Sequence, residues 1–210
     1  MVNKKYAYLA AAIGGAMILF AVLLVLIFGR GDNNKELRYE VYLSPSTQHK
    51  NMYYDGVTTE CASMNAVADH LEKLFPEKYT VYRNDPYDTL ESAIAHSNKL
   101  KPEIHIAIHS NASGVDGGGV RGCEIWIPAG DRESKRLAKA VYEYLEDLTP
   151  TEDRGIKETT TLAEMNNVDA TRILIEVDFH DDPDGSDWIK ANQGSLAQAI
   201  YNGISDYYGE

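Results

Sequence analysis

The sequence is poor in cysteine, with two in 210 residues, Cys61 and Cys123. Small secreted domains stapled by disulfides need more, so that class is excluded. Cys61 falls in a predicted helix and Cys123 in a predicted strand, both in apolar settings. A disulfide outside the cell and two buried thiols therefore both remain open. The sequence also lacks internal repeats and low-complexity tracts, which excludes a solenoid.

Basic residues are scarce as well: 20 Lys and Arg stand against 32 Asp and Glu, a net charge of −12. Lys4, Lys5 and Arg30 account for three of the 20, so the chain beyond residue 30 carries 17 basic and 32 acidic residues, a net charge of −15. Such an acidic surface repels the phosphates of nucleic acid and anionic lipid head groups. We therefore expect no nucleic-acid partner.

One long run of residues, 6–29, carries no charge. Its length suits a helix across a hydrocarbon core of about 30 Å, whereas the apolar core of a cleaved signal peptide usually has about 7–15 residues. A cleaved signal remains the alternative. We favour a transmembrane anchor, with residues 1–5 cytoplasmic, 30–37 as a linker and 38–210 as a domain outside the membrane. The protein would then be a single-pass cell-membrane protein with an extracytoplasmic domain.

Apolar periodicity in the remaining chain alternates between the strand and the helix pattern. Strands are predicted over residues 38–44, 78–83, 121–127 and 172–179, with another from residue 103. Helices are predicted over residues 58–75, 86–100, 131–148 and 194–208. Residues 149–167 are polar and hold at most a short strand at 156–161. This order predicts a single α/β domain, a three-layer sandwich whose mostly parallel, mixed sheet is flanked by helices.

The strand from residue 103 ends in a histidine and small polar residues. Its three isoleucines alternate with His105, Ala107 and His109, so the two sets fall on opposite sides of an extended strand. A strand buried on both faces is typical of a parallel sheet, whose ligands bind beyond the carboxyl ends of the strands. His109 lies at that end, whereas His105 is more typical of a hydrogen-bonded core histidine.

Glu176 interrupts a second apolar run, residues 172–179. A carboxylate in such a run is costly unless it is paired, bound to a metal ion or used in chemistry. An ion pair with Arg121 or Arg172 would satisfy it. If the two strands are neighbours, His109 and Glu176 reach one edge of the sheet, which indicates a metal-assisted hydrolase.

Two segments, Ala107-Ile-His-Ser-Asn-Ala112 and Leu174-Ile-Glu-Val-Asp-Phe179, resemble signatures of the zinc-dependent N-acetylmuramoyl-L-alanine amidases, the cell-wall hydrolase or autolysin type. The resemblance implies that His109 is a zinc ligand and Glu176 the catalytic carboxylate. The family's second ligand is a glutamate at the start of the first long helix, a position that Glu60 matches.

The first loop departs from this family's pattern. Members carry Asp-Pro-Gly-His-Gly-Gly after the first strand, with its histidine as a zinc ligand, whereas this chain has Ser44-Pro-Ser-Thr-Gln-His49. We favour His49 as the third ligand, reached through a shifted loop. His180, directly after the glutamate strand, is the alternative. A third possibility is that Gln48 stands in and the metal binds weakly.

The resemblance implies a peptidoglycan hydrolase that uses Zn²⁺ to cut the amide between N-acetylmuramic acid and L-alanine. Asn51 and Asn111 are candidate substrate-binding residues. One alternative is a zinc peptidase that cuts the stem peptides, which an arginine clamp for a terminal carboxylate, from Arg121 or Arg154, would favour. The other is a degenerate, non-catalytic amidase domain that binds cell wall.

Overall fold

Six strands form one mixed sheet in the order β2-β1-β3-β6-β4-β5 in the computed structural model, which describes residues 38–115, 118–151 and 154–210. The strands are β1 (Tyr39–Pro45), β2 (Tyr79–Arg83), β3 (Ile104–Asn111), β4 (Glu124–Pro128), β5 (Ile156–Thr159) and β6 (Thr171–Phe179). All neighbouring pairs are parallel except β4 and β6. The predicted α/β class and mostly parallel, mixed sheet are therefore confirmed.

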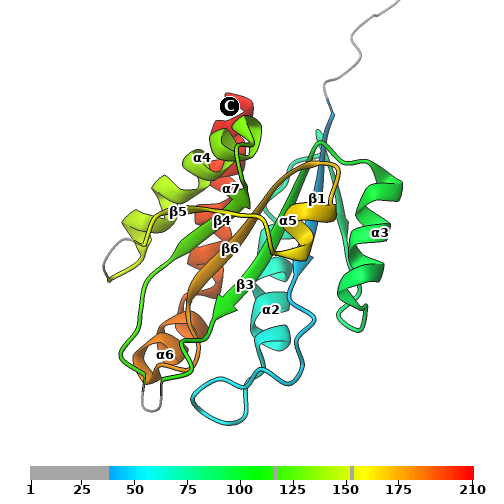
Figure 1. Ribbon diagram of the computed structural model, residues 1–210. Helices are drawn as coiled ribbons and strands as arrows, with labels where there is room; N and C mark the ends of the chain where they lie inside the picture. Colours follow the sequence, from blue (N-terminus) through cyan, green and yellow to red (C-terminus); the bar gives the residue numbers. More distant parts are fainter. Residues whose placement is uncertain (1–37, 116–117, 152–153) are drawn as a thin grey trace, which may run out of the picture. The chain divides into compact units, whose positions relative to one another are not determined.

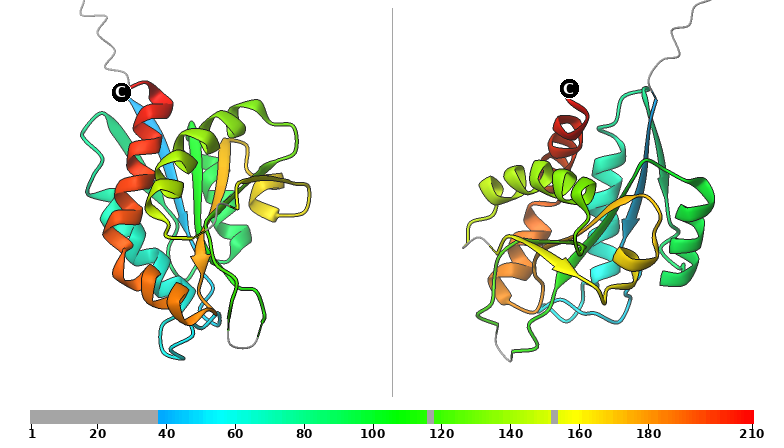
Figure 2. Two further views of the ribbon diagram at one scale, coloured as in Figure 1. Left: turned by 90° about the vertical axis from the view of Figure 1, so that its left-hand side faces the viewer. Right: turned by 45° about the horizontal axis from the view of Figure 1, so that its top comes forward.

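Helices lie on both faces of the sheet (Figures 1 and 2). They are α2 (Glu60–Glu72), α3 (Leu90–Leu100), α4 (Arg132–Leu148), α5 (Ala163–Asn167), α6 (Pro183–Ala191) and α7 (Gln193–Tyr208). Helices α2, α4 and α7 cover one face, and α3 and the short α5 lie on the other. Because α3 and α5 are shorter than α2, α4 and α7, helices cover less of the second face of the sheet.

The main core lies between the sheet and helices α2, α4 and α7. The three isoleucines of β3 point into this core, together with Ile173, Ile175 and Val177 of β6. On the opposite face a smaller cluster contains Ala107 and Leu174. Burial of β3 on both faces is thereby confirmed, and the polar side chains of β3 and β6 lie on the face with the smaller apolar cluster.

Two helices were not predicted from the sequence. Helix α5 has five residues, too few for a helical period, and no side chain caps its start. Helix α6 is polar, although Asp182 accepts a hydrogen bond from the Gly185 amide and Pro183 occupies its first turn. That aspartate–proline pair is a helix-start pattern that the sequence prediction did not use.

The predicted anchor at residues 6–29 and linker at 30–37 lie outside the described residues. Within the described ranges no helix has the length and apolar character needed to cross a membrane. Cys61 and Cys123 are both described, both buried, and not joined by a disulfide.

Gly203 marks the closest approach of α7 to α4. A Cβ atom added there would lie 2.4 Å from the Val141 Cα atom and 2.8 Å from the Ala140 carbonyl oxygen. Gly203→Ala should therefore lower the free energy of unfolding by about 1–3 kcal/mol, because backbone must move to relieve the overlap. Urea denaturation measures the loss.

The same helix offers a matched control, Gly194→Ala. A Cβ atom there meets nothing within 4 Å, so alanine should leave stability unchanged or raise it by up to about 1 kcal/mol. Equal effects of the two substitutions would contradict the close packing of α4 on α7.

Candidate active site

A histidine–glutamate pair lies where β3 ends and α2 begins. The His109 Nδ1 atom is 2.8 Å from Glu60 Oε1. Glu60 is the first residue of α2, whose N-cap Thr59 accepts a hydrogen bond from the Ala62 amide. The helix N-terminus favours the negative charge of this glutamate. Sequence reasoning placed these two residues in one site, and the structure brings them into contact.

The charges of Glu60 and His109 shift the pKa values of both groups. Burial of Glu60 acts to raise its pKa, but the hydrogen bond and charge of His109 outweigh burial and lower the pKa of the carboxyl. Burial of His109 acts to lower its pKa, but Glu164 and Glu60 outweigh burial and raise the pKa of the imidazole well above its usual value. The pocket around His109 is therefore strongly negative and favours a cation.

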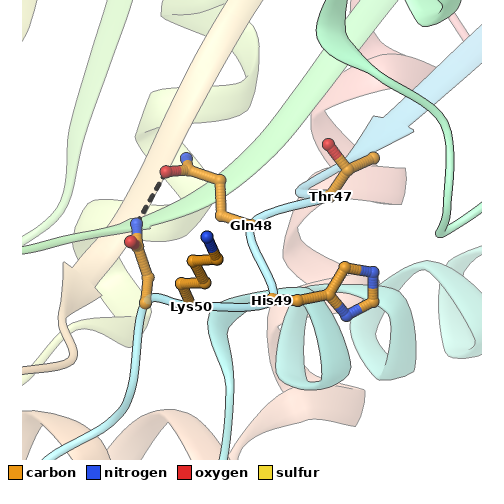
Figure 3. Close-up of a pocket in the computed structure, with 5 residues that line it drawn as sticks. Thr47, Gln48, His49 and Lys50 are labelled. Carbon is orange, nitrogen blue, oxygen red and sulfur yellow. Dashed lines mark hydrogen bonds between the residues drawn. The ribbon is translucent and has the colours of Figure 1, made fainter.

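Gln48 and Asn51 extend the cluster from the loop after β1. The Gln48 Nε2 atom lies 3.4 Å from His109 Nδ1. The Asn51 amide donates to Gln48 Oε1 at 2.7 Å and to Glu60 Oε2 at 2.8 Å, and Figure 3 shows the first of these bonds. Gln48, rather than His49, is thus the first-loop residue that the structure brings to His109 and Glu60.

His49 lies in the same loop but points in a different direction from Gln48 (Figure 3). Its Nε2 atom is 2.9 Å from the Pro86 carbonyl oxygen, and its ring stacks on Tyr87 with centroids 5.1 Å apart. Two backbone hydrogen bonds from the start of α2 hold the loop in this orientation: the Cys61 amide donates to the Gln48 carbonyl and the Glu60 amide to the Asn51 carbonyl. The structure therefore does not bring His49, the favoured third ligand, to the other candidates.

His180, the alternative ligand, is engaged elsewhere. It is 3% exposed, and its Nδ1 atom lies 2.9 Å from the Ser110 carbonyl oxygen and 3.0 Å from the Ser110 hydroxyl. Its ring stacks on Tyr53 with centroids 5.1 Å apart. These contacts hold His180 apart from Glu60 and His109.

Glu176 is the direct register partner of His109 across the parallel β3–β6 pair. Its Oε2 atom is buried and has no hydrogen-bond partner among the described residues. Burial, with the added repulsion of nearby carboxylates, raises the pKa of Glu176 to about 8. Arg121 pairs instead with Asp178, and Arg172 donates to a backbone carbonyl, so the ion pairs considered for Glu176 are not formed.

Glu164 on α5 is a member of the site that sequence reasoning missed. Its Oε1 atom accepts a hydrogen bond from the Ser44 hydroxyl at 2.6 Å and lies 3.1 Å from His105 Nε2. Its Oε2 atom lies 3.6 Å from His109 Nε2. Glu164 therefore backs the imidazole of His109 on the side away from Glu60. His105, also bonded to Ser97 at 2.9 Å, is a hydrogen-bonded core histidine as expected.

Removing the Glu164 carboxylate should cost stability. Glu164 is 4% exposed, and burial acts to raise its pKa, but bonds to His105 and His109 outweigh burial and lower it. Glu164→Ala leaves both imidazoles without this partner, so we expect about 3 kcal/mol less free energy of unfolding in urea. As a control, Glu158→Ala removes a half-exposed carboxylate and should change stability by less than about 0.5 kcal/mol. Equal losses in both variants would show that the buried network contributes nothing.

Asn111, a candidate substrate-binding residue, donates to Glu124 Oε1 at 3.0 Å. Glu124 in turn pairs with Glu176 in the β4–β6 register. Asn111 is thus bonded to the neighbour of Glu176, while Asn51 donates directly to Glu60.

The resemblance implies a divalent ion bound by the residues around His109. Among the described residues, no three His, Cys, Asp or Glu side chains are grouped as a metal site. Two usual ligands, Glu60 and His109, are in contact, and the Gln48 amide adds a neutral third group. The unpartnered Glu176 oxygen and the excess of carboxylates over imidazole both favour a bound cation. The residues fit a divalent ion, with one weak ligand in place of an imidazole.

Comparison with known proteins agrees with this geometry. The family model described as "N-acetylmuramoyl-L-alanine amidase" matches residues 25–206. The chain is 28% identical over 152 residues to the "Uncharacterized protein YqiI" of Bacillus subtilis (strain 168), covering 69% of this chain and 70% of that protein.

Two solved structures share the fold. An N-acetylmuramoyl-L-alanine amidase from Clostridium difficile 630 superimposes with a TM-score of 0.76 at 23% identity, over 82% of this chain and 98% of that one. The catalytic domain of CwlV, an N-acetylmuramoyl-L-alanine amidase from Bacillus (Paenibacillus) polymyxa var. colistinus, gives a TM-score of 0.73 at 21% identity, over 81% and 98% of the two chains.

Proposed function

Because the chain belongs to the N-acetylmuramoyl-L-alanine amidase family, we propose that it is a zinc-dependent hydrolase that cuts the amide between N-acetylmuramic acid and L-alanine in peptidoglycan. The observation that carries the proposal is the contact of His109 with Glu60 directly beside the unpartnered carboxyl of Glu176. A metal-assisted hydrolase needs such a set: ligands, an open position and a nearby carboxylate.

Glu60, His109 and Gln48 would hold the ion. The Gln48 amide nitrogen faces His109 and its oxygen accepts from Asn51, so the amide would rotate to bind the ion through its oxygen. Bound there, zinc would polarise the amide carbonyl and increase the acidity of a water molecule. Glu164 keeps the His109 ring in place from its far side, as carboxylates commonly do behind metal-binding histidines. An amide oxygen is a weaker zinc ligand than an imidazole, so we expect weaker metal binding than in relatives with the full histidine motif.

Glu176 is the proposed general base and then general acid. It would take a proton from the attacking water and deliver it to the nitrogen of the leaving L-alanine, which becomes a free amine. The strand holds this carboxyl at a fixed position next to His109, as a proton-transfer group requires. A pKa near 8 without a cation would fall when a positive charge binds nearby, so the carboxyl would be ionised when the site is loaded.

Mass spectrometry of digested peptidoglycan tests the reaction. An amidase releases intact stem peptides with a free L-alanine amino group and leaves N-acetylmuramic acid without peptide. A zinc peptidase would shorten the peptides and leave L-alanine on the glycan. Glycan that keeps L-alanine after complete digestion would overturn the proposed bond and support the peptidase.

One observation favours a second candidate, a cell-wall-binding domain without activity. Gln48 stands next to His109, where neither His49 nor His180 reaches. If the two remaining ligands cannot retain zinc, the purified full chain should bind peptidoglycan in a pull-down but release no peptides at any zinc concentration. Release that depends on zinc excludes this candidate.

We also propose that the protein is anchored by residues 6–29 with its domain outside the membrane. The uncharged run flanked by Lys5 and Arg30 supports an anchor, and a peptidoglycan substrate lies on the outer side. Protease treatment of intact cells should degrade the domain, and its protection would contradict this orientation.

A further inference from the structure

A cavity of about 550 Å³ lies beside the candidate active site and takes no part in the mechanism above. Its lining consists of Gly119, Val120, Arg121, Pro150, Thr151 and Arg154. Two of these described residues are arginines, and each is ion-paired with a carboxylate outside this set, Arg121 with Asp178 and Arg154 with Glu124. Guanidinium nitrogens that such pairs leave unused are suited to bind an anionic group.

The Arg154 guanidinium is held in place by its neighbours but uses only part of its capacity to donate hydrogen bonds. Its Nε atom donates to Glu124 Oε2 at 2.7 Å, and its plane lies over the Phe179 ring, 4.7 Å from the centroid. Its two terminal nitrogens have no partner among the described residues. Lys157 also pairs with Glu124, so two cations share this one carboxylate.

Two further donors line the cavity. The Thr151 hydroxyl is buried and has no hydrogen-bond partner within the described ranges, a costly arrangement unless a ligand satisfies it. Arg121 is held by Asp178 through Nε and Nη2, while its Nη1 atom is 3.7 Å from the nearest carboxylate oxygen, Asp182 Oδ1. Both groups are therefore able to donate into the cavity.

The cavity is linked to the reaction site through Glu124. This residue is the register partner of Glu176 in the antiparallel β4–β6 pair, so the two side chains project from the same face of the sheet. The distance from Glu176 to the Arg154 guanidinium is therefore the spacing of two neighbouring strands plus the length of one ion pair. Together these amount to a distance on the order of 10 Å. An extended peptide covers this distance in about three residues.

Resting on the proposed function, we infer that this cavity binds a free carboxylate of the peptide that leaves when the amide is cut, two or three residues from the cleaved bond. The planar guanidinium of Arg154 matches a carboxylate through two parallel hydrogen bonds, and the Thr151 hydroxyl adds a third donor. The cavity would thus select peptides whose carboxylates are free over peptides in which they are amidated.

The test uses two synthetic muramoyl tripeptides that are identical except that the peptide carboxylates are free in one and carboxamides in the other. The full-length chain should cleave the free acid with a kcat/KM about 10- to 100-fold higher, because charge-assisted hydrogen bonds are replaced by weaker ones in the amide. The difference should appear in KM. In Arg154→Gln the ratio of kcat/KM for the free acid to kcat/KM for the amide should fall to about one. In Thr151→Val this ratio should fall by a smaller amount.

A structural role for Arg154 predicts a different pattern. If this residue only supports Glu124, Arg154→Gln lowers both rates by the same factor and preserves the ratio, which would overturn the inference. Arg136→Gln is the matched control, because Arg136 also pairs with a glutamate and lies over an aromatic ring, Tyr207, but on α4. It should preserve the ratio.

Failure of the subsite and failure of the amidase proposal can be told apart. Equal cleavage of both substrates by the wild-type chain keeps the amidase and overturns the subsite. If neither substrate is cleaved, calorimetry with the corresponding free tripeptides decides. Tighter binding of the acid, lost in Arg154→Gln, supports the subsite without the activity, and equal binding overturns it.

Discussion

Glu176→Gln should lower kcat for muramoyl-peptide hydrolysis by about 10²- to 10⁴-fold, the usual contribution of a general acid–base group. The glutamine side chain has nearly the same shape but cannot take the proton of the attacking water. Substrate binding should change little, because Glu176 acts on the water and the leaving nitrogen. Release of free L-alanine amino groups from a synthetic muramoyl peptide measures the rate.

The same variant should fold at least as stably as the wild-type chain. In the absence of a cation, burial of the Glu176 carboxyl, with added repulsion from nearby carboxylates, raises its pKa to about 8, and glutamine removes the cost of burying that charge at higher pH. Glu143→Gln, on the exposed face of α4, serves as the control and should leave kcat unchanged. Wild-type activity in Glu176→Gln would exclude this carboxyl as the base.

Chelation of divalent metal should abolish hydrolysis, and added Zn²⁺ should restore it. Because the first loop supplies an amide rather than an imidazole, half-maximal activity should require more free zinc than a site with three strong ligands would. Gln48→His should lower the required concentration by at least about 10-fold, a change typical of altered metal surroundings. Activity measured against buffered free zinc gives both values.

His49 supplies the matched control for this experiment. It is the neighbouring residue in the same loop, but it contacts Pro86 and Tyr87 rather than His109. His49→Ala should therefore leave the zinc dependence unchanged, whereas Gln48→Ala should weaken it. The opposite ranking would show that His49 turns into the site when metal binds, as the sequence suggested.

Much of the fold could be predicted because its strands and long helices have clear apolar periods. The same patterns bring His109 and Glu176 together, since strands that are buried on both faces of a parallel sheet end at one edge. That His109 lies directly opposite Glu176 depends on the register between β3 and β6, and tertiary packing sets this register. Glu60 was identified through the family resemblance, which implies a glutamate ligand at the start of the first long helix.

Side chains in loops and short elements could not be predicted in this way. Whether Gln48 or His49 faces the site depends on how the loop is held on α2, by backbone hydrogen bonds from the Glu60 amide to Asn51 and from the Cys61 amide to Gln48. Glu164 lies on a five-residue helix inside a polar segment, and its contact with His105 spans 59 positions of sequence. Neither feature leaves a periodic pattern in the sequence.

The central claim is that one divalent ion is held by His109 and Glu60 beside Glu176. The most direct measurement is the zinc content of the full-length chain after equilibration with Zn²⁺ and removal of unbound metal, compared with His109→Ala and Glu60→Ala. We predict about one zinc per wild-type chain and a loss of that zinc in both variants. A wild-type chain without zinc, or variants that retain it in full, would contradict the account.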